Sequence, residues 1–204
     1  MFLSKAPARL AALILLVSLT ACTGVGEADS AATDTGASAG LGADANAILA
    51  RYDIEAPASA TDLIERLQAQ PLADRPDGLT ASVRVNELLL ASGGNEVSLA
   101  LPQDEFHLSI APYLTETHEC FYHSLTTCVG ELGNEDFHVT ITDDASKTVL
   151  FDSDVTTFDN GFFDVTLPAG LDITVLIDDG ERSVALALGT RVDDATCVTA
   201  AQLI

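Results

Sequence analysis

The feature that most constrains this chain is a two-residue alternation of apolar and polar side chains in its second half. The alternation starts at 106–110 and returns at 137–141. Successive side chains of a strand point to opposite faces, so the pattern predicts half-buried strands. Further short strands are predicted at 148–151, 162–167, 173–177, 183–188 and 197–203. Because turns rich in Asp, Asn and Gly separate them, the pattern favours a mostly antiparallel β-sandwich over residues 103–204.

The preceding segment, residues 45–102, predicts a small domain of mixed α/β character. A short helix is expected over 45–52, and a second helix is expected to begin with Thr61 or Asp62 as its N-cap and to end before Pro71. After Gly78 the apolar period changes to two, which predicts short strands up to residue 101. The expected fold class is therefore α+β, a small mixed N-terminal part followed by the sandwich.

Export signals occupy the start of the chain. Lys5 and Arg9 precede a ten-residue apolar run at 10–19, which is too short to cross a bilayer, since that takes about 20 apolar residues. Leu19-Thr20-Ala21-Cys22 resembles a bacterial lipobox, in which the cysteine becomes lipidated. We therefore expect a signal peptide over 1–21, a lipid anchor on Cys22 and a flexible linker over 22–44. This predicts an extracytoplasmic lipoprotein that contacts the membrane only through its anchor.

Charge narrows the choice of partners. The chain has 31 acidic and 9 basic side chains, a formal net charge of -22, so it lacks the basic footprint that nucleic acids require. Several acids stand in pairs, such as Asp143-Asp144 and Asp178-Asp179, but none completes a calcium-loop pattern. We expect these pairs to be solvated turns.

Histidines and cysteines cluster in one segment of the predicted sandwich. All four histidines lie between His107 and His138, and the densest part runs from His118 through Cys120 and His123 to Cys128. Thiolate and imidazole bind soft or borderline metals, Cu(I) and zinc in particular. The last cysteine, on the final predicted strand, can reach this loop if the sandwich brings the two together. His107 and His138 alternate with apolar strand residues and are expected to be surface or hydrogen-bonded side chains, not ligands.

An odd number of cysteines in the folded part needs an explanation. Cys120, Cys128 and Cys197 allow one internal bridge at most, which leaves one thiol in an oxidising compartment. On the chain-entropy relation a bridge from Cys120 to Cys128 would stabilise by about 2.5 kcal/mol, and one from Cys128 to Cys197 by about 4.4 kcal/mol. Metal ligation, intermolecular pairing and thiol redox chemistry remain open explanations.

Longer motifs add a resemblance to a known family. The stretch FHLSIAPYLTETHECFYHSLTTCVGE at 106–131, with Leu-Gly-Asn after it, resembles the signature of the CueP family of periplasmic copper-binding proteins. Similar segments occur at 75–90, 159–162, 167–168 and 196–199, so the likeness covers residue 45 to the C-terminus. The resemblance implies extracytoplasmic copper binding and copper tolerance through Cys120, Cys128 and Cys197.

These observations combine into one functional hypothesis and two alternatives. The first is that the cysteines bind Cu(I) as thiolates, with His118 and His123 as auxiliary donors or as residues that support the ligands without binding the ion. The protein would then buffer copper and pass it to a copper-receiving extracytoplasmic protein. The second is a thiol oxidoreductase that couples cysteine oxidation to reduction of Cu(II) or Fe(III), with Cys120 and Cys128 bridging in each cycle. The third is a metal-free adhesion or scaffold module stapled by one bridge. No catalytic residue is predicted, and a homodimer is left open.

Overall fold

The computed structural model describes residues 40–204 of the chain. The predicted signal peptide, the lipidation site Cys22 and residues 22–39 of the predicted linker lie outside this range. Within residues 40–204, no helix combines the length and the apolar character needed to cross a membrane.

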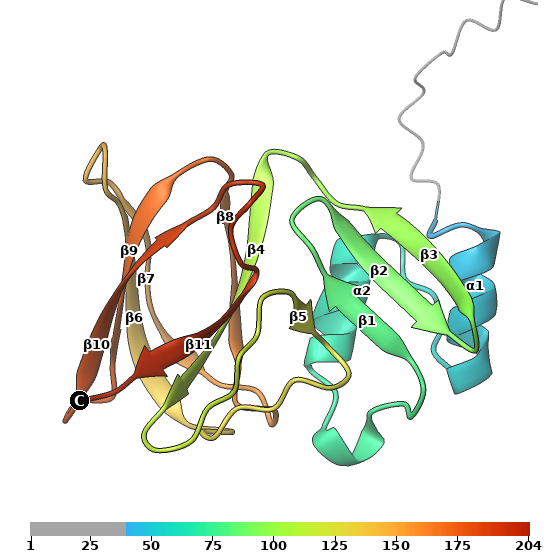
Figure 1. The fold of residues 1–204 in the computed structure, drawn as a ribbon, viewed down its shortest axis with the longest axis horizontal. Coiled ribbons are helices and arrows are strands. Elements are labelled where there is room, and N and C mark those ends of the chain that lie inside the picture. The colour runs from blue at the N-terminus through green and yellow to red at the C-terminus, as the bar shows by residue number, and fades with distance from the viewer. Residues whose placement is uncertain (1–39) are drawn as a thin grey trace, which may run out of the picture. The chain divides into compact units, whose positions relative to one another are not determined.

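Two short helices open the described chain (Figure 1). Helix α1 covers Ala43–Leu49 and continues as a 3-10 turn, η1, at Ala50–Tyr52, while α2 covers Ala60–Gln68 and is followed by η2 at Leu72–Asp74. The predicted cap of α2 was wrong by two or three residues. Ser59 is the N-cap, because its backbone is extended and its Oγ accepts a hydrogen bond from the backbone N–H of Asp62 at 3.1 Å.

A four-stranded sheet packs with these helices. Its strands are β1 (Thr80–Val83), β2 (Glu87–Ser92), β3 (Asn95–Ala100) and β5 (His123–Ser124), in the order β3-β2-β1-β5. Buried side chains of α1 and α2 form one apolar cluster with those of β1–β3 and with Leu125. The two-residue strand β5 comes from the segment assigned to the sandwich by sequence and pairs with β1. The division of the folded chain at residue 102 stays a prediction.

The remaining strands build a β-sandwich, as the alternation predicted. One sheet has the order β10-β9-β6-β7 and the other β11-β4-β8. The strand bounds are β4 Glu105–Tyr113, β6 Asp136–Asp143, β7 Val149–Thr156, β8 Phe163–Pro168, β9 Asp172–Asp178, β10 Ser183–Gly189 and β11 Cys197–Gln202. Alternate residues of β4, β6, β8 and β9 fill one apolar core between the sheets. This confirms the α+β class with a sandwich-like arrangement.

The pairing of the last strand places the cysteines. Strand β11 runs parallel to β4, with Cys197 opposite Ser109, whereas the other strand pairs of the sandwich are antiparallel. The loop that leaves the end of β4 carries Cys120 and returns past the start of β11 to β5 (Figure 1). Two segments about 77 residues apart in sequence thus lie side by side.

Carboxylates of the acidic turns accept hydrogen bonds from nearby backbone amides. Asp143 accepts from the backbone N–H of Ala145, Asp178 from that of Gly180, and Asp179 from that of Arg182. Hydrogen bonds from the hydroxyl of Ser146 and the N–H of Ala145 lower the pKa of Asp143, and hydrogen bonds from the N–H groups of Glu181 and Arg182 lower that of Asp179. The carboxylates therefore satisfy turn amides.

Candidate metal centre

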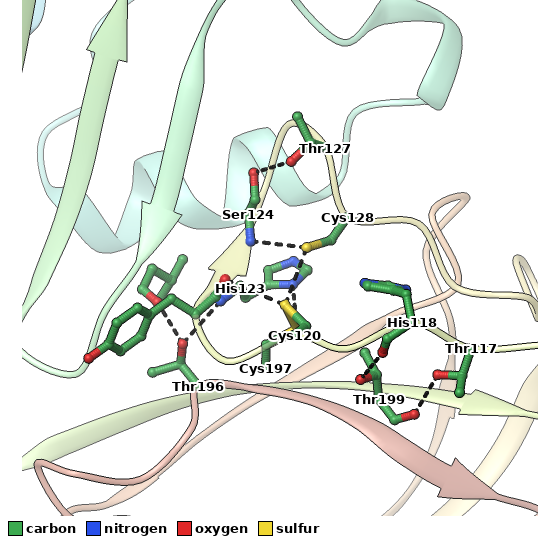
Figure 2. The surroundings of a disulfide bond; sticks show 12 residues. Thr117, His118, Cys120, His123, Ser124, Thr127, Cys128, Thr196, Cys197 and Thr199 are labelled. Carbon is green, nitrogen blue, oxygen red and sulfur yellow. Dashed lines mark hydrogen bonds between the residues drawn. A yellow bond between two sulfur atoms is a disulfide. The ribbon is translucent and has the colours of Figure 1, made fainter.

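Backbone hydrogen bonds bring the cysteine-bearing segments together. The N–H of Cys197 donates to the carbonyl of Phe121 at 3.1 Å, which joins the start of β11 to the Cys120 loop. After β5 the chain makes a tight turn in which the N–H of Cys128 donates to the carbonyl of Ser124 at 3.0 Å. This turn folds Cys128 back toward the other two sulfur atoms (Figure 2).

The sulfur atoms form one compact group. A disulfide joins Cys120 to Cys197, with their Cα atoms 5.6 Å apart, and Cys128 is a buried free thiol. The Sγ of Cys128 lies 3.5 Å from the Sγ of Cys120. Neither bridge considered from the sequence is formed. The observed pairing follows from the parallel alignment of β11 and β4, which the sequence does not encode locally.

His123 is the buried imidazole of the group. Its Nδ1 lies 3.7 Å from the Sγ of Cys197, and its Nε2 lies 3.0 Å from Oε1 of Gln68. The ring packs over the ring of Phe162, with centroids 4.5 Å apart. Burial lowers the pKa of His123 to about 4, so the ring is neutral at ordinary extracytoplasmic pH.

His118 lies at the exposed side of the sulfur atoms. Figure 2 shows it beside Cys120, across from His123, and its backbone carbonyl accepts a hydrogen bond from Oγ1 of Thr199 at 2.6 Å. Donor atoms of His118, Cys120 and Cys128 all lie within 4.8 Å of one another, as do those of His123, Cys128 and Cys197. Cys128 belongs to both triplets, so the free thiol is at the centre of the five predicted site residues.

The other two histidines lie elsewhere, with partners of their own. His107 is nearly buried and its Nε2 lies 3.2 Å from a carboxylate oxygen of Asp164. His138 is exposed and bonds to Asp152 and Asp154, and these hydrogen bonds raise its pKa. Both are hydrogen-bonded strand residues, as the alternation predicted.

Three residues that the sequence did not single out complete the surroundings. Gln68 contacts His123, and Asn160 contacts Gln68. Arg75 donates from Nη1 to the carbonyl of Cys128 at 2.8 Å, while its buried Nε and Nη2 have no hydrogen-bond partner among residues 40–204. Burial raises the pKa of the Cys128 thiol, and the N–H of Ser124 and the Arg75 charge partly offset this rise. Arg75 lies in a motif of the family resemblance, but Gln68 carries no such signal.

A surface hollow gives access to one side of the group. It has a volume of about 740 Å³ and is lined by Tyr113, Thr117, His118, Glu119, Cys120, Phe121, Thr199 and Ala200. Cys120 is half-buried at its floor, whereas His123 and Cys197 are fully or almost fully buried. An ion would therefore meet His118 and Cys120 first.

The donor set fits a soft metal ion. Three sulfur atoms and two imidazoles lie together, and no carboxylate belongs to either triplet of close donors. Sulfur ligands of this kind select Cu(I) and zinc over hard cations. Among the three cysteines of residues 40–204, only Cys128 offers a thiol in the bridged form, so a three-thiolate site requires reduction of the Cys120–Cys197 disulfide.

Comparison with known proteins agrees with this chemistry. The family described as "Periplasmic copper-binding protein CueP" matches residues 62–202. A solved structure titled "Crystal Structure of S.CueP" is 30% identical, with a TM-score of 0.73, over 80% of this chain and 99% of that chain. No curated protein matches the sequence.

Proposed function

This chain belongs to the CueP family of periplasmic copper-binding proteins, and from that membership we propose that it buffers Cu(I) outside the cytoplasmic membrane. The observation that carries the proposal is the compact group of three sulfur atoms with a buried neutral imidazole. Cys120, Cys128 and Cys197 are the proposed thiolate ligands, with His123 and His118 as auxiliary donors. Lipid attachment at Cys22, proposed from the lipobox, would keep the protein at the membrane.

Loading follows reduction of the bridge. A dithiol reductant delivers two electrons and two protons to the disulfide and leaves thiols on Cys120 and Cys197. Cu(I) then displaces the protons of the thiols. His123 is neutral, so its ring can bind the ion without first losing a proton. Cu(I) accepts few ligands, so exchange of one sulfur at a time is chemically easy.

Release to a copper-receiving protein would start at the exposed side. His118 and Cys120 line the surface hollow, so an incoming thiolate can replace Cys120 while Cys128 and Cys197 still hold the ion. The formal charge of -22 attracts cations in general but does not select copper. In this proposal the sulfur ligands give the site its selectivity for copper.

A redox function is the second candidate, and the sulfur contact favours it. Two thiols that close to a disulfide release two electrons and two protons, enough to reduce two Cu(II) ions to Cu(I). Because Cys128 lies 3.5 Å from one bridged sulfur, exchange can move the bridge among the three cysteines. The raised pKa of Cys128 slows such attack, since the thiolate is the nucleophile.

Competition against a Cu(I) chelator under anaerobic conditions tests the main proposal. Reduced wild type should compete strongly, and each of Cys120→Ser, Cys128→Ser and Cys197→Ser should lose most of the affinity, because a hydroxyl is a poor Cu(I) ligand. Val129→Ser is a matched exposed control beside Cys128 and should bind as wild type does. Equal affinity in all three cysteine variants and wild type would overturn the proposal. Loss of Cu(II) reduction with unchanged Cu(I) affinity would instead favour the redox candidate.

A further inference from the structure

A buried amide links the second helix to the metal centre. Gln68, in the last turn of α2, is fully buried, and its side chain reaches residues 55 to 96 positions further along the chain. Its Nε2 lies 3.0 Å from Oδ1 of Asp164, and its Oε1 lies 3.0 Å from Nε2 of His123 and 3.2 Å from Nδ2 of Asn160. All three partners of Gln68 are polar, and two of them, His123 and Asn160, are fully buried as Gln68 is.

Two neighbours independently fix which way the Gln68 amide points. The Asp164 carboxylate accepts hydrogen bonds, so the atom of Gln68 that faces it is the NH₂ donor. Asn160 is oriented by its own Oδ1, which accepts from the backbone N–H of Phe162 at 3.0 Å, and so it offers its NH₂ to Gln68. Both constraints place the carbonyl oxygen of Gln68 against His123.

The amide orientation then decides the state of the imidazole. A carbonyl oxygen only accepts, so the proton of the neutral His123 ring is on Nε2. Nδ1 is therefore unprotonated, and it is the nitrogen that lies 3.7 Å from the Sγ of Cys197. We infer that Gln68 is a positioning residue of this centre, which acts through His123 by holding the ring with its bare Nδ1 toward the sulfur atoms.

The consequence for copper rests on the proposed function. Nδ1 is the ring nitrogen on the sulfur side, and its lone pair binds a metal only when no proton occupies it. In the other tautomer a proton would stand at the sulfur atoms and the lone pair would face the acceptor oxygen of Gln68. Residues that fix a ligating histidine in this way typically contribute about 10–100-fold in metal affinity.

The first test is ¹⁵N NMR of the histidine rings in the oxidised, metal-free protein. Wild type should show His123 with a protonated Nε2 and a bare Nδ1, and Gln68→Leu should lose this single tautomer. After reduction, Gln68→Leu should bind Cu(I) about 10–100-fold more weakly than wild type. Leu67→Ala is the matched control, because Leu67 is buried in the same helical turn, so this variant loses stability but keeps the His123 tautomer and the affinity.

A compensating pair separates positioning from folding. In the double variant Gln68→Glu/Asp164→Asn, residue 68 keeps an oxygen that accepts a hydrogen bond from His123, and the amide of residue 164 replaces the donor that residue 68 has lost. The tautomer of His123 and the affinity for Cu(I) should therefore remain near wild type. A wild-type ring with its proton on Nδ1 would overturn the inference, as would Gln68→Leu with wild-type tautomer and affinity. If wild type fails to bind Cu(I), the proposed function fails, whereas the tautomer of the metal-free ring still decides the inference.

Discussion

Breaking the Cys120–Cys197 bridge should cost a defined amount of stability. The bridged residues are 77 positions apart, and on the chain-entropy relation a loop of that length stabilises the fold by about 4.5 kcal/mol. A bridge from Cys120 to Cys128 would close only eight residues and contribute about 2.5 kcal/mol. The size of the loss on reduction therefore distinguishes the observed bridge from a Cys120–Cys128 bridge. A Cys128–Cys197 bridge would contribute about 4.4 kcal/mol, so only a variant that lacks Cys128 distinguishes it from the observed one.

Urea unfolding with and without a dithiol reductant measures this loss in wild type and variants. Cys128→Ser keeps the bridge, so reduction should cost it about 4.5 kcal/mol, as in wild type. Cys120→Ser/Cys128→Ser is the control, because it cannot form any internal bridge in the folded part and should not respond to reductant. A wild-type loss near 2.5 kcal/mol, or a Cys128→Ser variant that is insensitive to reductant, would refute the pairing.

Three further predictions concern protonation and anchoring. The unfolding free energy should fall by about 3 kcal/mol as pH drops from 6.5 to 4, because His123 takes up a proton in the unfolded chain but stays neutral in the fold, where its pKa is about 4. His123→Gln should flatten this part of the urea-unfolding pH profile. An unchanged slope in this variant would contradict the prediction. Hydrogen bonds from the hydroxyl and the N–H of Thr115, and then from the N–H of Leu114, lower the pKa of Glu131 to about 2, so its contribution to stability should be present above pH 4.5 and fade toward pH 2. Glu131→Gln should melt at a lower temperature than wild type at pH 7 and at about the same temperature at pH 2. Cys22→Ser should move the protein from the membrane fraction to the soluble one with unchanged melting, and retention in the membrane would reject the lipobox.

The strands were predictable because their signal is local. An alternating side chain reports its own burial, so β4, β6 and β9 follow directly from their apolar positions. Strand β5 has only two residues, too few to show any period. The cap of α2 was misplaced because Ser59, Thr61 and Asp62 are all acceptable N-caps and only the backbone conformation distinguishes them.

The members of the candidate centre were predictable by chemistry, but their connections were not. Cysteine and histidine stand out in any sequence, and the five residues proposed as ligands do lie in one group. The bridge depends on the register between β11 and β4, and the role of Gln68 depends on contacts 55 and 96 residues away. Such long-range contacts leave no pattern in the sequence near either partner.

On the proposed function, the bridge and a bound Cu(I) ion would stabilise the same assembly in turn. The centre ties β11 to β5, and Thr196 reinforces this by donating to the carbonyl of Val83 on β1 and accepting from the N–H of His123. Reduction lowers the stability of the whole fold by about 4.5 kcal/mol. On the proposed function, Cu(I) at a thousandfold excess over its dissociation constant would return at most about 4.1 kcal/mol, and binding of Cu(I) to the cysteines of the unfolded chain would reduce this gain. On the proposed function, the reduced, metal-free form would then be the least stable of the three, and it is also the form that would take up copper.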